Sequence, residues 1–171
     1  SVIDELPPGR KPIATKVVKA SRREEVMQGL QTWLAKGLQA YWVCPLIEES
    51  EALQLQTAVE SFDELTKALP DFKVGLVHGR LKADEKAAVM AAFKANDIQL
   101  LVATTVIEVG VDVPNASLMI IENSERLGLS QLHQLRGRVG RGTVQSHCLL
   151  LYQHPLSIQG AERLKVMRST S

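Results

Sequence analysis

The sequence has few residues of the kinds that mark secreted, membrane-spanning or zinc-binding proteins. Its two cysteines, Cys44 and Cys148, lie far apart in separate apolar runs. Structural zinc needs several Cys or His ligands at short spacings, so this pattern predicts two buried free thiols in a reducing compartment. No apolar run approaches the length of a membrane span, and the first residues are acids and prolines where a signal peptide carries basic residues. A cytoplasmic protein without a membrane partner is expected.

An excess of charge of one sign is also missing. Lys and Arg number 20 against 19 Asp and Glu, which gives a formal net charge of +1. No global positive field therefore attracts nucleic acid, and any such contact has to come from local clusters. Aromatic residues make up 4% of the chain. Trp33, Tyr41, Trp42 and Phe93 lie in predicted regular elements, which favours packing over base stacking.

The patterns that are present predict one α/β domain. A chain of 171 residues with 45% hydrophobic residues can form one buried core but not two full domains. Strand-like and helical segments alternate, which favours an open, mainly parallel sheet with helices on both faces. The predicted strands are 13–18, 40–47, 73–78, 98–103, 116–122 and 147–152, and the predicted helices are 22–36, 50–69 and 82–95, with others from 130 and after 156. Ser21 is a candidate helix cap, the acidic run 48–51 a capped helix start, and Gly37 a helix end. Residues 1–12, with three prolines, are typical of an interdomain linker.

Two predicted strands end in residues suited to binding an anion. Ligands of open parallel sheets lie beyond the carboxyl ends of the strands, so phosphate-binding loops are expected along that one edge. His78, Gly79 and Arg80 could hold an anion with backbone N–H groups, although a plain turn with a solvated arginine accounts for them better.

The stretch 103–114, here called the threonine segment, follows the most hydrophobic strand. Thr104 and Thr105 could bind phosphate oxygens, and Asp112 could accept a hydrogen bond from a ribose hydroxyl. Helix caps and a turn before Pro114 explain the same residues equally well.

The stretch from Gln134 to Arg141, here called the arginine segment, is the most informative. As a helix it would place Gln134, Arg138 and Arg141 on one face. Its two glycines would each cost a helix about 1 kcal/mol, so they indicate a close backbone approach or an early helix end. Arginines on one face repel unless an anion or acids such as Glu122 or Glu125 neutralise them. The pattern favours a polyphosphate over the acids.

The arginine segment resembles motif VI of superfamily 2 helicases, and the threonine segment looks like their motif V. The motif VI resemblance rests on Gln134, Gly137, Arg138, Gly140 and Arg141. Residues 41–51, 77–80 and 125–136 are similar to the RecG helicases of that superfamily, which remodel stalled replication forks and branched DNA in repair and recombination. The resemblance covers nearly the whole chain. It implies that 13–155 form a C-terminal RecA-like domain and that 156–171 begin a truncated helical hairpin.

The resemblance also implies roles for individual residues. Arg141 would be the arginine finger at the γ-phosphate of ATP, with Arg138 beside it and Gln134 linking the nucleotide to the DNA side. Three residues would approach the nucleotide, namely Gly110, Asp112 and Gly137. Five would lie along the DNA track and contact backbone phosphates without reading bases, namely His78, Gly79, Arg80, Thr104 and Thr105.

The chain departs from the complete helicase pattern because it has no Gly-x-x-x-x-Gly-Lys-Ser/Thr loop and no Asp-Glu-x-His box. The resemblance places both on a first RecA-like lobe, where the ligands of Mg²⁺ are expected. That lobe, a wedge domain of the same polypeptide, and forked DNA are the implied partners, and the chain alone is predicted not to hydrolyse ATP. A transcription-repair coupling translocase of the Mfd type, another superfamily 2 helicase, and a non-enzymatic RecA-like adaptor that binds an acidic protein are the alternatives.

Overall fold

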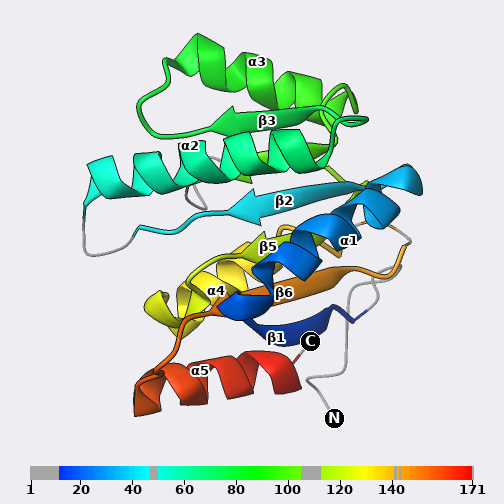
Figure 1. Ribbon diagram of the computed structural model, residues 1–171. Coiled ribbons are helices and arrows are strands. Elements are labelled where there is room, and N and C mark those ends of the chain that lie inside the picture. The colour runs from blue at the N-terminus through cyan, green and yellow to red at the C-terminus, as the bar shows by residue number, and fades with distance from the viewer. Residues whose placement is uncertain (1–11, 47–49, 105–112, 141, 143, 171) are drawn as a thin grey trace.

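A six-stranded parallel sheet forms the centre of the protein in this computed structural model, with strand order β1-β6-β5-β2-β4-β3 (Figure 1). The structure describes residues 12–46, 50–104, 113–140, 142 and 144–170, so most of the predicted linker lies outside the described residues. The strands are β1 (Ala14–Lys19), β2 (Gln39–Val43), β3 (Val74–Val77), β4 (Leu100–Ala103), β5 (Ala116–Ile121) and β6 (His147–Tyr152). The predicted open parallel sheet is confirmed.

Helices cover both faces of this sheet and make a three-layer arrangement (Figure 1). Helices α1 (Arg23–Ala35) and α2 (Glu51–Ala68) pack on one face. Helices α3 (Ala83–Lys94), α4 (Leu129–Arg136) and α5 (Ile158–Ser169) pack on the other. Short 3₁₀ turns precede α1 and α4, at η2 (Ala20–Arg22) and η4 (Ser124–Arg126). Leu164 and Met167 of α5 lie in the same buried cluster as the residues of α3 and α4.

The central strands explain the unbroken apolar runs of the sequence. Every residue of β2, β4 and β5 is buried, because helices cover both sides of these strands. Both cysteines are buried free thiols, as predicted. Tyr41, Trp42 and Phe93 are fully buried, which confirms packing over stacking for these rings. Strand β2 ends at Val43, earlier than predicted.

The observed helix ends agree in part with those predicted from the sequence. Ser50 caps α2, because its Oγ accepts a hydrogen bond from Leu53 N at 3.2 Å. Gly37 follows α1 with a φ of +84°, which a glycine adopts without strain. Ser21 is not a cap, because the 3₁₀ turn η2 leads into α1 and places Arg22 at the N-cap without a side-chain hydrogen bond.

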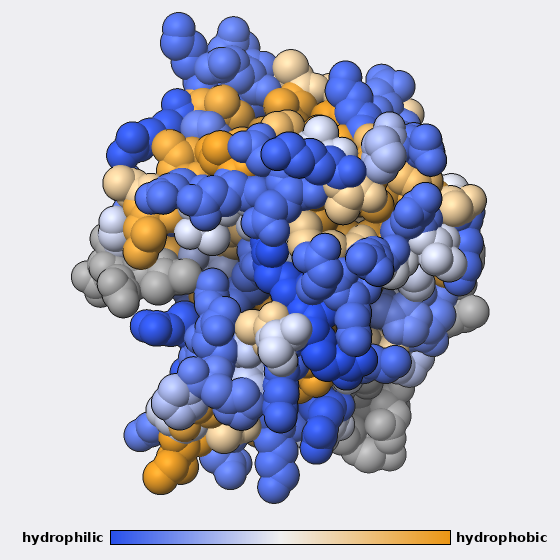
Figure 2. Space-filling view, viewed as in Figure 1, coloured by the Kyte–Doolittle hydropathy of each residue, from blue (hydrophilic) through white to orange (hydrophobic). Residues whose placement is uncertain are grey.

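The face that carries α1 and α2 is largely hydrophilic, with hydrophobic side chains showing mainly in its upper part, around α2 and α3 (Figure 2). Hydrophobic atoms also show at the lower left, where α5 begins, and Ile158 in the first turn of α5 is 82% exposed. No helix within the described ranges is long and apolar enough to cross a bilayer.

Candidate functional site

The predicted phosphate-contacting residues divide between two opposite edges of the sheet. His78, Gly79 and Arg80 follow β3, and Thr104 follows β4. These strands are neighbours, with Val77 beside Ala103, so the four residues share the carboxyl edge. Arg80 and Gly79 are exposed, His78 is half-buried and Thr104 is 3% exposed. His78 Nδ1 accepts a hydrogen bond from Arg80 N at 3.2 Å, which shapes the turn.

The arginine segment lies at the other edge. Helix α4 follows β5 and returns to the amino ends of the strands, where Arg136 Nη1 lies 3.2 Å from Thr15 Oγ1 in β1. A Cβ on Gly142, just after the segment, would lie 2.6 Å from the Pro114 carbonyl oxygen, and Pro114 lies two residues before the start of β5. The expectation that all phosphate-binding loops line the carboxyl edge is therefore wrong for the arginine segment, because α4 carries the chain back across the sheet.

The two described ends of the threonine segment lie at opposite edges of the sheet. Thr104 lies at the carboxyl edge after β4, whereas Val113 and Pro114 lie at the amino edge before β5. Thr105, Gly110 and Asp112 are outside the described residues. The threonine segment thus begins beside the predicted DNA-contacting residues. Its other end lies against Gly142, the residue that follows the arginine segment.

The single helical face proposed for the arginine segment is not formed. Helix α4 ends at Arg136, Gly137 is its C-cap, and Gly140 has a φ of +84°. The alternative that the glycines mark an early helix end is the one observed. Gln134 is exposed on α4, Gly137 and Arg138 are half-buried in the turn that follows, and Arg141 lies outside the described residues.

The described acidic side chains leave Arg138 without an ion pair. Within the part of the chain that the structure describes, no carboxylate pairs with it, and the two candidate acids have other partners. Glu122 binds Arg23, and Glu125 lies 3.5 Å from Arg126. Neither Glu122 nor Glu125 therefore neutralises Arg138, and a role for this guanidinium in binding an anion stays a prediction.

The carboxyl edge contains two buried polar links that the sequence did not reveal. Gln54 of α2 is 7% exposed, and its Nε2 donates to Thr104 O at 2.8 Å and Cys44 O at 3.3 Å. This amide joins the ends of β2 and β4 and fixes the start of the threonine segment. No sequence pattern near Gln54 predicts this link, because a buried glutamine in a helix only interrupts the stripe of apolar residues.

The second link is the carboxylate of Glu122 at the end of β5. It accepts hydrogen bonds from Trp42 Nε1 at 2.9 Å, from Ser61 Oγ at 3.0 Å and from Arg23 Nε. Arg23 also binds Glu64 at 2.8 Å. The nearby ion pairs raise the pKa of Arg23 even though burial opposes this. The cluster fastens α1 and α2 to the sheet.

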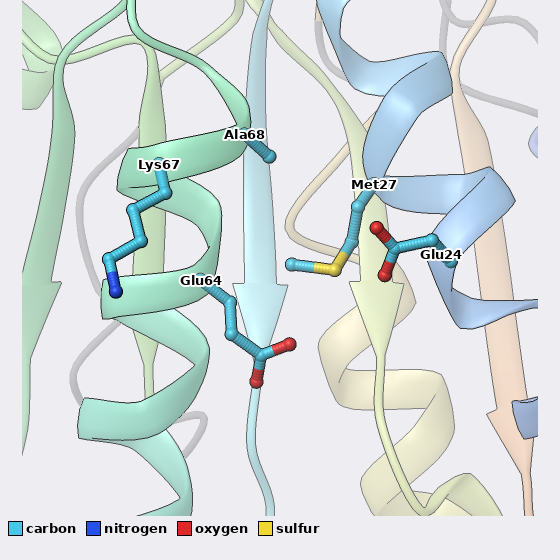
Figure 3. A pocket seen from close by; sticks show the side chains of 5 residues that line it. All are labelled: Glu24, Met27, Glu64, Lys67 and Ala68. Atoms are coloured by element: carbon cyan, nitrogen blue, oxygen red, sulfur yellow. The ribbon is translucent and has the colours of Figure 1, made fainter.

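A hollow of about 330 Å³ lies between α1 and α2, on the face opposite the arginine segment. Met27 and Glu24 come from α1, and Glu64, Lys67 and Ala68 come from α2 (Figure 3). None of the residues singled out from the sequence lines it. Among the described residues, no group of three His, Cys, Asp or Glu side chains could hold a metal ion.

Comparison with known families supports the motif resemblance. Residues 21–143 match the family described as the helicase conserved C-terminal domain. The chain belongs to this family. The chain is 62% identical over 172 residues to the ATP-dependent DNA helicase RecG of Escherichia coli K12. It is 63% identical over 170 residues to the ATP-dependent DNA helicase RecG of Acidithiobacillus ferridurans. These alignments cover 100% and 99% of the chain and 25% of each relative, so the chain spans about a quarter of their length.

Solved helicase C-terminal domains have the same architecture. The RecG bound to a three-way DNA junction superposes with a TM-score of 0.81 at 45% identity, over 99% of this chain and 22% of that one. The C-terminal domain of the DEAD-box protein Dbp5 gives a TM-score of 0.62 at 14% identity, over 94% of this chain and 84% of that one. The second comparison shows the fold alone, and both confirm the RecA-like class.

Proposed function

We propose that this helicase C-terminal domain is the second motor lobe of an ATP-dependent helicase that acts on branched DNA, in repair and recombination. The observation that carries the proposal is the similarity over the whole chain to RecG, one example of which was solved on a three-way DNA junction. The whole-protein activity comes from relatives four times as long, so it also needs a first lobe.

The arginine segment supplies the groups for ATP. Arg138 and Arg141 would stabilise charge on the γ-phosphate, with Arg141 as the finger, and Gln134 would link this step to the DNA side. Gly110, Asp112 and Gly137 would approach the nucleotide. The absence of a carboxylate partner for Arg138 among the described residues supports this role, because an internal ion pair would compete with the phosphate.

The carboxyl edge supplies the groups for DNA. Arg80 is exposed beside Gly79 and His78, and backbone contacts of this kind hold a phosphate without reading sequence. Thr104 and Thr105 would continue the track. The threonine segment starts at this edge, and Pro114 near its end lies against Gly142, which supports a role in linking DNA contact to the arginine segment.

Mg²⁺ would be held by the first lobe together with the phosphates of ATP, in keeping with the few protein ligands that this ion takes at such sites. The partners of the chain are then the first lobe and a wedge domain of the same polypeptide, together with forked DNA. A cytoplasmic location is proposed with them.

The proposal is tested by fork-stimulated ATP turnover in the full-length protein carrying Arg141→Ala. A loss of about a thousandfold with ATP and DNA binding retained is expected for a finger that acts in the transition state. Arg126→Ala, at an exposed arginine of η4, is the matched control. Near-normal turnover of Arg141→Ala would remove that residue from catalysis and transfer the role to Arg138.

The DNA ligand distinguishes the alternatives. Stronger stimulation by forked DNA than by plain duplex or RNA supports the RecG type. Equal stimulation by plain duplex would favour a transcription-repair translocase, and stimulation by RNA would favour an RNA helicase. Stimulation by no nucleic acid would favour the adaptor.

A further inference from the structure

Arg136, the last residue of α4, is a buried cation at 4% exposure that joins three elements. Its Nη1 donates to the carbonyl oxygens of Met167 at 2.9 Å and Thr170 at 3.0 Å, and to Thr15 Oγ1 at 3.2 Å. Its Nη2 donates to Thr170 Oγ1 at 2.9 Å and lies 3.2 Å from His133 Nδ1. One guanidinium thus connects α4, β1 and the C-terminal end of α5.

The end of α5 compensates the charge of Arg136. Among the described residues its hydrogen-bond partners are neutral oxygens and one imidazole nitrogen. The last carbonyl groups of a helix lack internal partners and carry partial negative charge, so a cation is favourable there. Burial lowers the pKa of Arg136, but a guanidinium still keeps its proton at neutral pH. The planar fork of arginine serves several acceptors at once, which a lysine ammonium on a flexible stem does less well.

This anchor lies two residues from a proposed catalytic arginine. The Arg136 carbonyl oxygen accepts a hydrogen bond from Val139 N at 3.2 Å, and Arg138 N donates to Leu135 O at 2.9 Å. Val139 is fully buried, so the turn that contains Arg138 cannot shift independently of the end of α4. The position of Arg138 therefore depends on Arg136, and through its side chain on α5.

We propose that Arg136 is a positioning residue, which sets Arg138 at the amino edge of the sheet by binding the C-terminal end of α5. The inference rests on the proposed function of the arginine segment and goes further by naming the residue and the helix that hold the segment in place. The proposal gives Arg136 no direct contact with the nucleotide, because its Nη donors are directed at α5, β1 and His133. Its Nη1 contacts Thr15 of β1, the edge strand beside which α5 lies (Figure 1).

The test is Arg136→Lys in the full-length protein, with ATP turnover measured on forked DNA. We expect kcat to fall about tenfold while the KM for ATP and the affinity for the fork stay within about twofold, because misplaced arginines weaken only the transition state. Arg168→Lys is the matched control, since Arg168 is an exposed arginine in the last turn of the same helix. It should keep the parental kcat.

Turnover is expressed per nucleotide-binding molecule, so that a loss of folded protein does not imitate a loss of kcat. Thr170→Val gives a second variant, because it removes one of the acceptors and leaves the Thr170 and Met167 carbonyl groups in place. It should lower kcat in the same direction by a smaller factor. Parental kcat in both variants overturns the positioning role and leaves the proposed function intact. A parent protein without DNA-stimulated turnover overturns the proposed function itself.

Discussion

The lowered pKa values of two histidines predict that the stability of the domain depends on pH. Burial, and then the charge of Arg136, lower the pKa of His133, and burial followed by Lys16 and Lys36 lowers that of His147. Both rings therefore bind protons less readily in the folded state than in the unfolded state. The unfolded state takes up more protons as the pH falls, so this contribution is present above the unfolded pKa of about 6.5 and lost below it.

Unfolding in urea should show the effect as a steady fall in the free energy of unfolding between about pH 7.5 and pH 5. A His133→Gln and His147→Gln double variant should flatten this slope, and His154→Gln controls for the loss of an exposed histidine. An unchanged slope in the double variant would show that these rings do not cause it.

One buried carboxylate, that of Glu122, links α1 and α2 to the end of β5. Glu122→Ala leaves Trp42 Nε1, Ser61 Oγ and Arg23 without their common acceptor. Removing one partner from a largely buried ion pair costs about 3 kcal/mol of the free energy of unfolding. Urea denaturation checks this.

The control for that variant is Glu64→Ala, at a more exposed partner of the same arginine. Its side chain is 48% exposed, so the expected loss is below about 1 kcal/mol. An equal loss in both variants would contradict a special role for Glu122. A double-mutant cycle of Arg23→Ala with Glu122→Ala should show coupling, because the two groups share one network.

Gly142, the residue after the arginine segment, lies against Pro114 at the end of the threonine segment. A Cβ at position 142 would lie 2.6 Å from a backbone oxygen, so Gly142→Ala has to displace one of the two stretches. We expect about a tenfold loss of fork-stimulated ATP turnover in the full-length protein, because small displacements of catalytic groups are costly.

Gly29→Ala is the matched glycine control. A Cβ at position 29 meets nothing within 4 Å, and the residue is exposed in α1, so alanine should add up to about 1 kcal/mol of stability. Parental turnover in Gly142→Ala would show that the contact does not serve the arginine segment.

The 171 residues of the chain contain neither the phosphate-binding loop nor the magnesium box that ATP hydrolysis requires in this superfamily. We therefore expect the chain by itself to release no phosphate from ATP, with or without forked DNA, and the full-length protein to do so. Phosphate release measured on both, at equal concentration, is the check. Robust turnover by the chain alone would contradict the division of work between two lobes.

How much of the fold and of the candidate site the sequence predicts depends on how far apart in the chain the interacting residues lie. Strands such as β4 and β5 are evident because burial on both faces requires continuous apolar residues. The ion pair of Arg23 and Glu122, and the bonds of Arg136 to α5, join residues far apart in the chain, so no spacing rule reveals them. The placement of the arginine segment at the amino edge was missed for the same reason, since it depends on where α4 returns.

The sheet order sets a condition on how the chain folds during its synthesis. Strand β1 pairs with β6, from Ala14 beside His147 to Lys19 beside Tyr152, so the first described strand joins its neighbour only after the last has left the ribosome. Closing so long a loop is slow, because its entropy is lost before the contacts form. Until then, the flank of β5 that β6 later covers stays open to other chains. In pulsed hydrogen exchange, β1 should gain protection last, and a chaperone that shields this flank should raise the yield of native protein.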